Sequence, residues 1–116
     1  MVDQFDFVFL IQDDNHWEKL FSHIVNLKQQ SVVNNIAVVI LNTAILSCLE
    51  STHLDAIKVT FSKLTNENIE FYLCTNTLFR YGMEENMLLP EIKIAKEGGL
   101  LKVALFETLG YHKVTL

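Results

Sequence analysis

Short apolar runs alternate along the chain with longer segments in which apolar residues recur periodically. The runs at residues 5–11, 36–41 and 69–73 are almost wholly apolar and rich in β-branched and aromatic side chains, which is typical of strands covered on both faces. Residues 92–95 and 111–116 alternate in character, as shorter and partly exposed strands do. The pattern therefore predicts five strands.

Two of the intervening segments have the three- and four-residue spacing of amphipathic helices. The first covers residues 16–29, where Asn15 and Glu18 have the spacing of a capping box. The second reaches about residue 65 and begins at a cap, Ser51 or Thr52. The positions expected to face the sheet are Trp17, Leu20, Phe21, Ile24 and Leu27 in the first helix and Leu54, Ile57, Phe61 and Leu64 in the second.

Glycines delimit the remaining helical segments. A short helix is expected after Cys74 and ends at Gly82, which suits a left-handed position after a helix. Gly98 and Gly99 open a last helix over residues 100–109, and Gly110 stops it. Residues 44–50 are expected to form one further helical turn.

The segment between Met83 and Pro90 is expected to be a loop. It carries an apolar cluster, residues 87–89, that needs a cover from the protein's own core or from a partner subunit. Because exposed patches of this kind mark interfaces, the cluster predicts self-association.

Five strands joined by helical crossovers predict one domain over residues 1–116. Its expected fold class is α/β, a three-layer α/β/α sandwich with a mostly parallel five-stranded sheet. The residues expected to be most buried in its central strands are Val8, Leu10, Val38, Ile40, Leu41, Phe71 and Leu73. Ligands of such folds bind beyond the carboxyl ends of the strands.

Three polar segments follow the first three predicted strands and are expected to converge at that edge of the sheet. They are residues 12–14, which include Asp13, residues 42–43, which include Asn42, and residues 74–77. In the last of these, Thr75, Asn76 and Thr77 follow a cysteine. We expect Asn76 and Thr77 to act foremost as helix caps, with contact to a ligand as the further possibility.

Composition and charge exclude several classes of partner. The chain has 116 residues and a net charge of −5 without a basic stripe, which argues against nucleic acid and anionic membranes. It has no secretory leader and no run of about 20 apolar residues, so a cytoplasmic protein without a membrane span is expected. Cys48 and Cys74 have no metal-type spacing, and a disulfide between them is not expected in a reducing compartment. No metal or organic cofactor is predicted.

Cys74 is the strongest candidate for chemistry because a buried strand passes into a helix at this residue. The free amides and positive dipole end of a helix favour a thiolate. Buried cysteines are common at strand ends, however, so an inert structural Cys74 stays open as an alternative. Cys48 lies in an apolar helical run and is expected to be structural.

Other chemistries of this fold class do not fit the sequence. The four glycines match neither the dinucleotide nor the Walker pattern. The pair Asp13-Asp14 resembles that of a phospho-receiver domain, but Cys74 stands where a receiver has its acceptor aspartate. The sequence has no Cys-x-x-Cys motif and no nucleophile elbow.

The run Phe71-Tyr72-Leu73-Cys74-Thr75-Asn76-Thr77-Leu78, followed by Gly82, Leu88-Leu89-Pro90, Gly98 and Gly110-Tyr111, resembles the DsrE/DsrF-like (YchN-like) family. The resemblance covers nearly the whole chain in element order. It implies a small parallel α/β/α sandwich that assembles as homotrimers or hexamers. In the sulfur-relay members, the cysteine after the third strand carries sulfur as a persulfide, and Cys74 occupies that place.

Two functions from different classes follow. In the first, Cys74 takes sulfane sulfur from a donor, holds it as a persulfide and passes it to the thiol of a partner protein. In the second, the protein is an oligomeric scaffold or a small-ligand-binding domain with a buried, inert Cys74. The second stays open because residues 75–78 differ from the small and basic residues that follow the cysteine in sulfur-relay members. Whether the protein is an enzyme is left open.

Overall fold

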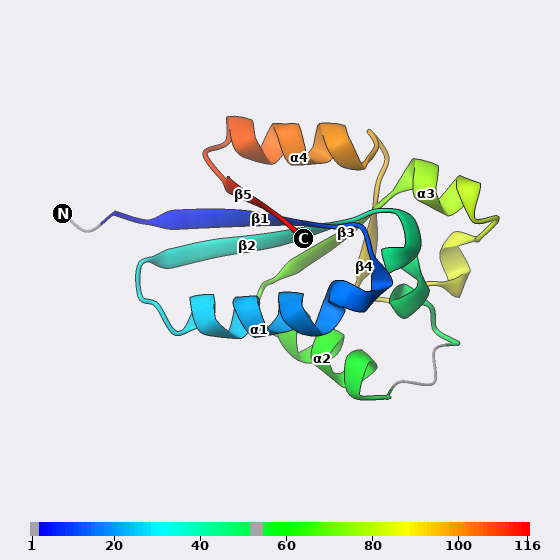
Figure 1. The fold of residues 1–116 in the computed structure, drawn as a ribbon, viewed down its shortest axis with the longest axis horizontal. Coiled ribbons are helices and arrows are strands. Elements are labelled where there is room, and N and C mark those ends of the chain that lie inside the picture. The colour runs from blue at the N-terminus through cyan, green and yellow to red at the C-terminus, as the bar shows by residue number, and fades with distance from the viewer. Residues whose placement is uncertain (1–2, 52–54) are drawn as a thin grey trace.

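A computed structural model of the chain describes residues 3–51 and 55–116. It contains a five-stranded sheet flanked by helices (Figure 1). The strands are β1 (Phe5–Ile11), β2 (Val33–Ile40), β3 (Glu70–Cys74), β4 (Ile92–Ala95) and β5 (His112–Thr115). The α-helices are α1 (Trp17–Lys28), α2 (Asp55–Asn66), α3 (Thr75–Arg80) and α4 (Gly99–Thr108), and the 3-10 helices are η1 (Asp14–His16), η2 (Asn42–Cys48) and η3 (Glu85–Met87).

The sheet has the order β4-β3-β2-β1-β5, and all of its neighbouring strands are parallel. This confirms the predicted α/β class and the predicted three layers. β2, the cleanest strand in the sequence, lies at the centre of the sheet. All seven residues expected to be most buried are at most 8% exposed, although Leu41 lies one residue beyond β2.

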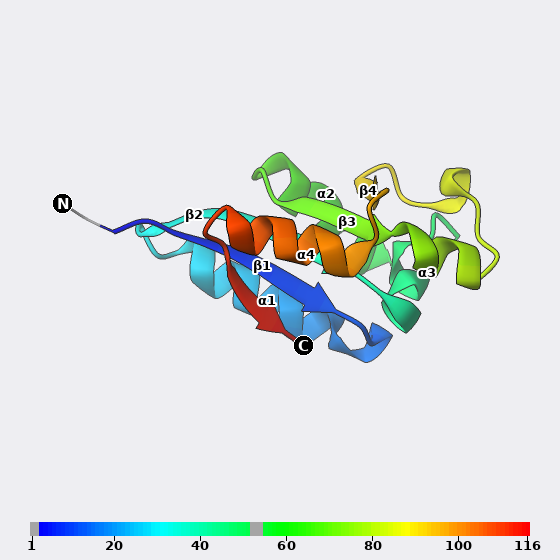
Figure 2. The same ribbon diagram turned by 90° about the horizontal axis from the view of Figure 1, so that it is seen from above.

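The two faces of the sheet are covered unequally. α1 and α2 lie on one face and α4 alone lies on the other (Figures 1 and 2). The α1/α2 face encloses the larger core, in which the rings of Trp17, Phe61 and Phe71 pack edge to face or tilted against one another. On the other face, α4 buries only two apolar side chains against the sheet, Val103 and Phe106.

Strand alternation assigns the side chains of β3 to the two cores. Phe71 and Leu73 point to the α1/α2 face, whereas Tyr72 and Cys74 point to the α4 face. The thiol of Cys74 therefore lies at the carboxyl end of a central strand, beneath the first turn of α4.

The predicted helix starts are partly wrong. Asn15 and Glu18 form no capping box; instead Asp13 caps η1 by accepting a hydrogen bond from the amide of Asn15 (2.8 Å), and α1 follows without a side-chain cap. The spacing of Asn15 and Glu18 did not mark the start of α1 because the 3-10 helix η1 precedes it. The expected cap at Thr52 and the expected inward position of Leu54 lie outside the described residues.

Of the two covers left open for the cluster 87–89, the protein's own core provides the cover for two of the three residues, so these two do not support the predicted self-association. Leu88 and Leu89 are 7% and 4% exposed and belong to the core on the α1/α2 face. The amide of Leu89 donates to the carbonyl of Cys48 and the amide of Glu50 to the carbonyl of Met87 (both 2.8 Å), which fixes the loop against η2. The protein's own core therefore provides their cover, and Met87 alone stays exposed.

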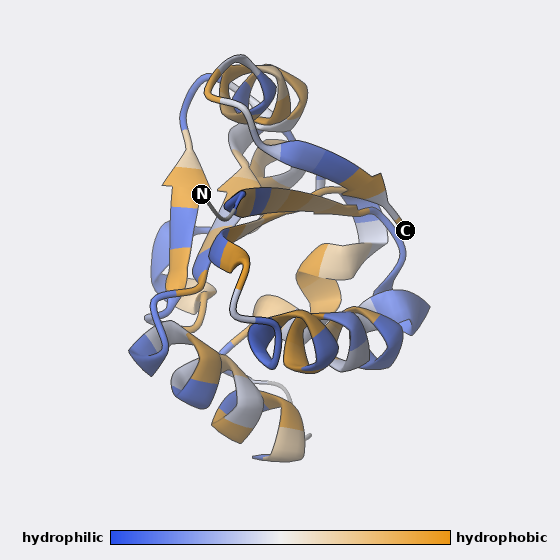
Figure 3. Cartoon of the chain, turned by 90° about the vertical axis from the view of Figure 1, so that its left-hand side faces the viewer, coloured by the Kyte–Doolittle hydropathy of each residue, from blue (hydrophilic) through white to orange (hydrophobic). Residues whose placement is uncertain are grey.

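A group of exposed apolar residues lies on α4 and at its C-cap instead. Hydrophobic residues surround much of this helix (Figure 3). The outward-facing residues, called here the α4 leucine face, are Leu100, Leu101, Leu105 and Leu109, which are 45–72% exposed. None of the helices among residues 3–51 and 55–116 is long and apolar enough to cross a membrane.

Candidate functional site

A pocket of about 330 Å³ lies at the carboxyl edge of the sheet and includes Cys74. Strand ends and helix starts meet there, as expected for a parallel sheet. Its lining residues are Gln12, Leu41, Asn42, Cys74, Asn76, Thr77, Arg80, Glu97, Gly98, Gly99, Leu100 and Leu101. We call it the Cys74 pocket.

The thiol of Cys74 is surrounded by hydrogen-bond donors. Burial raises its pKa, but the backbone amides of Gly99, Thr77 and Asn76 and the hydroxyl of Thr77 act against burial, and the resulting pKa lies below the ordinary value of a cysteine. These amides belong to the first turns of α3 and α4, where no helical acceptor is available to them. Cys74 therefore forms its thiolate more readily than an ordinary cysteine, although the residue is only 5% exposed.

The orientation of the Thr77 hydroxyl follows from a second hydrogen bond. Thr77 is 4% exposed, and its Oγ1 accepts from the backbone amide of Asn42 (3.2 Å). Because that amide occupies the oxygen as an acceptor, the hydroxyl proton is free to point at Cys74. Asn42 adopts a left-handed backbone (φ 53°), which is uncommon for a residue other than glycine and occurs where surrounding contacts hold it.

Gly99 permits the close approach of α4 to Cys74. A Cβ atom at this position would lie 2.4 Å from Cδ2 of Leu41 and 3.0 Å from Cβ of Cys74. Gly98, the residue before it, has a φ of 90°. Residues that have a Cβ atom rarely adopt this backbone conformation. The Gly98-Gly99 pair thus brings the amide of Gly99 to the sulfur.

The structure brings some of the predicted site residues together and not others. Cys74, Asn76, Thr77 and Asn42 line one pocket. Asn76 and Thr77 supply amides from inside the first turn of α3, so they are not its N-cap, which is Cys74 itself.

Asp13 and Thr75 are not among the lining residues. The carboxylate of Asp13 serves the cap of η1. The sequence predicts no ligand contact for Gly99, Arg80 or Glu97. The paired glycines before an apolar helix were the available signal for Gly99, because they indicate a close approach of backbone.

The other cysteine is in a different environment. Cys48 is wholly buried in the core on the α1/α2 face, and its Sγ lies 3.6 Å from the carbonyl oxygen of Ala44. Burial, and then the charge of Asp14, raises its pKa well above the ordinary value. Cys48 is therefore held as a neutral thiol.

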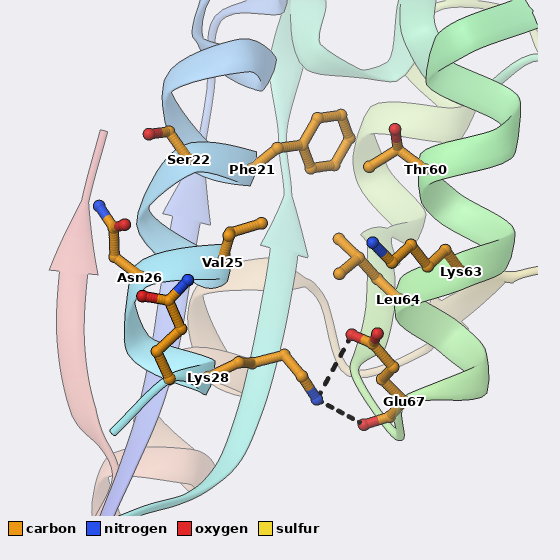
Figure 4. Close-up of a pocket in the computed structure, with 10 residues that line it drawn as sticks. Phe21, Ser22, Val25, Asn26, Lys28, Thr60, Lys63, Leu64 and Glu67 are labelled. Atoms are coloured by element: carbon orange, nitrogen blue, oxygen red, sulfur yellow. Dashed lines mark hydrogen bonds and ion pairs between the residues drawn. The ribbon is translucent and has the colours of Figure 1, made fainter. Parts of the chain in front are cut away.

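A second pocket, of about 470 Å³, lies between α1 and α2 (Figure 4). Phe21, Val25 and Leu64 contribute its apolar side chains, and an ion pair between Lys28 and Glu67 (3.5 Å) lies at one end. Its lining residues include no cysteine and no histidine. Within the described part of the chain, no three His, Cys, Asp or Glu side chains gather to hold a metal ion.

Comparison with known proteins identifies relatives of the fold. No protein-family model matches the chain, and no curated protein matches it significantly. Among solved structures, the protein of unknown function MTH1491 from Methanobacterium thermoautotrophicum matches with a TM-score of 0.86 and 23% identity, over 97% of this chain and 100% of that one.

Two further structures match over nearly the same length. The ychN protein from E. coli has a TM-score of 0.72 at 21% identity, over 97% of this chain and 99% of that one. The conserved protein of unknown function BT1422 from Bacteroides thetaiotaomicron has a TM-score of 0.71 at 12% identity, over 96% and 94%. The chain therefore has the fold of the E. coli ychN protein, as its resemblance to the DsrE/DsrF-like (YchN-like) family implied.

Proposed function

We propose that the protein is a DsrE/DsrF-like sulfur carrier that holds sulfane sulfur as a persulfide on Cys74. The single observation that carries the proposal is the set of donors around the thiol: three backbone amides and the hydroxyl of Thr77 lower its pKa despite burial. A thiolate is the nucleophile in sulfur exchange. The fold relatives and the position of Cys74 after the third strand agree with the resemblance.

The proposed reaction needs no cofactor. The thiolate of Cys74 attacks the outer sulfur of a donor persulfide, the donor's S–S bond breaks, and the donor leaves as a thiolate. The reverse exchange passes the sulfur to an acceptor thiol on a partner protein. This chemistry requires a reduced Cys74 and so suits the cytoplasm.

We further propose that copies of this chain assemble through the α4 leucine face. Exposed leucines on a helix that is apolar around most of its surface favour an interface. The resemblance implies a trimer or a hexamer. This surface replaces residues 87–89 as the basis for self-association.

The second candidate function is that of a scaffold or small-ligand binder with an inert thiol. The observation in its favour is that Cys74 is only 5% exposed. Titration of the folded protein with a small alkylating reagent separates the two. A carrier reacts at Cys74 before denaturation, whereas an inert thiol reacts only afterwards.

The decisive experiment is persulfidation of the folded protein with inorganic polysulfide, followed by mass spectrometry of its peptides. We expect one added sulfur at Cys74, its loss in Cys74→Ser, and no change in Cys48→Ser. Cys48→Ser is a matched control because it makes the same change of thiol to hydroxyl at the other buried cysteine. Equal labelling of both cysteines, or no labelling of either, would contradict the carrier function and support the scaffold function.

A further inference from the structure

The Cys74 pocket contains two side chains of opposite charge that do not pair with each other. Arg80 comes from the last turn of α3, and Glu97 comes from the turn before α4. Within residues 3–51 and 55–116 the one salt bridge is between Lys28 and Glu67. Neither charge is therefore neutralised by an ion pair within these residues, and both residues line the pocket.

Arg80 is directed toward the pocket by Asn42. Its Nη1 lies 3.5 Å from Oδ1 of Asn42, a long and weak hydrogen bond that leaves the other guanidinium N–H groups free. A guanidinium binds a carboxylate through two parallel hydrogen bonds. The carboxylate of Glu97 is the complementary partner for an ammonium group.

The size of the pocket admits a small ligand. The pocket has a volume of about 330 Å³ and is partly open to solvent, so it has room for a free amino acid carrying one additional sulfur.

We propose that the sulfur donor of this site is a zwitterionic persulfide of free-cysteine size. Its carboxylate binds Arg80, its ammonium binds Glu97, and its outer sulfur faces Cys74. The inference rests on the proposed sulfur-carrier function and adds the chemical class of the donor to it.

The transfer step balances without a further reagent. The thiolate of Cys74 attacks the outer sulfur of R–S–SH, and a new S–S bond forms on Cys74. The S–S bond of the donor breaks, and its electron pair leaves on the inner sulfur as R–S⁻. The hydrogen stays on the transferred sulfur, so no external oxidant or reductant takes part.

The test compares three donors that differ only in their charged groups. They are cysteine hydropersulfide, its N-acetyl derivative, which lacks the ammonium, and its methyl ester, which lacks the carboxylate. Inorganic polysulfide is the reference because it has neither a carboxylate nor an ammonium group, and as a simple anion it reports any general effect of a variant on the thiolate. The rate of persulfide formation at Cys74 is measured for the wild type and for Arg80→Gln and Glu97→Gln. The three donors release different thiols and therefore differ in intrinsic rate. This difference cancels when the rate of each variant is divided by the rate of the wild type with the same donor.

Arg80→Gln should slow the free and N-acetyl donors by about two- to fivefold, the range of an exposed ion pair, and leave the methyl ester unchanged. Glu97→Gln should slow the free donor and the methyl ester to the same extent and leave the N-acetyl donor unchanged. Lys96→Gln and Glu107→Gln are matched controls. They remove the same charges from exposed positions that do not line the pocket.

Each outcome decides between the two proposals. If both variants slow all donors equally, polysulfide included, the charges act on the thiolate and the zwitterionic donor is overturned while the carrier function stands. The same holds if neither variant changes any rate. If no donor labels Cys74, polysulfide included, the carrier function itself fails.

Discussion

The two faces of the sheet each enclose one cysteine, and the two environments differ in both packing and polarity. Cys48 lies among the large apolar side chains on the α1/α2 face, where burial keeps its thiol neutral. Cys74 lies beneath α4, in a smaller core that ends at a pocket. Burial alone therefore does not decide the state of a thiol, because unpaired backbone amides at the starts of helices offset it.

The same contrast appears in the energetics expected of the two faces. The α1/α2 face contains a cluster of four aromatic rings, in which Phe61 lies 4.9–5.6 Å from the rings of Phe71, Trp17 and Phe21. The α4 face relies on Phe106, packed against Tyr72 and Tyr111 and 8% exposed. One face is thus built for stability, and the other leaves room for a pocket and for exposed leucines.

The largest expected effect compares one substitution on both faces. Phe61→Ala should lower the free energy of unfolding by about 3–5 kcal/mol, because it leaves a cavity in a closed core. Phe106→Ala should cost roughly half as much, since the more open α4 face can collapse onto the site. Urea unfolding followed by far-UV circular dichroism at one protein concentration measures both.

Phe79→Ala is the control for this comparison. Phe79 is 78% exposed, and its truncation should change stability by less than about 0.5 kcal/mol. Equal losses for Phe61→Ala and Phe106→Ala would contradict the unequal roles of the two faces.

The next effect concerns assembly through the α4 face. Leu105→Gln combined with Leu109→Gln should weaken self-association by about 3 kcal/mol, the burial of two leucines, or roughly two orders of magnitude in dissociation constant. Both residues lie outside the lining of the Cys74 pocket. Light scattering at micromolar concentration should show a smaller mass than that of the wild type.

Val59→Gln supplies the comparison on the other face. Val59 is 66% exposed on α2, and its substitution should leave the mass unchanged. A wild type that is already a monomer at this concentration would overturn the assembly proposal.

The fold was largely predictable because the apolar strand runs, the periods of two helices and the glycines at helix ends point to the same order of elements. The expected limits of the first strand coincide with those of β1, and Gly82 and Gly110 have the positive φ angles (64° and 93°) expected after helices. Local sequence patterns did not predict burial where contacts between distant segments determine it. Leu88 and Leu89 read as an exposed loop, yet hydrogen bonds to η2 fold them into the core.

The site was predictable only in part for the same reason. Strand ends placed Cys74, Asn42 and Thr77 at one edge of the sheet, because parallel topology requires it. The contribution of Gly99 depends on α4 returning over Cys74 from 25 positions further along the chain. No periodicity in the sequence encodes that approach.

The smallest expected effect isolates one donor to the thiolate. Thr77→Val removes the hydroxyl that helps to lower the pKa of Cys74 and keeps the shape of the side chain. A hydrogen bond to a charged group contributes about 1.5 kcal/mol, so alkylation of Cys74 by iodoacetamide at neutral pH should slow by about tenfold. Because a higher pKa depletes the thiolate only below that pKa, the difference should shrink as the pH rises and vanish in strong alkali.

Thr77→Ser is the matched control for this loss. It keeps the hydroxyl, so its oxygen still accepts from the amide of Asn42 and its proton still reaches Cys74, and the pH profile of alkylation should stay close to that of the wild type. Thr77→Val also leaves the amide of Asn42 without its acceptor, so both variants need a check by urea unfolding. A Thr77→Val protein that is folded and alkylates with the wild-type pH profile would show that the backbone amides alone hold the thiolate. In that case the contrast between the two cysteines would rest on main-chain donors, and the side chain at position 77 would serve only to fix the left-handed turn at Asn42.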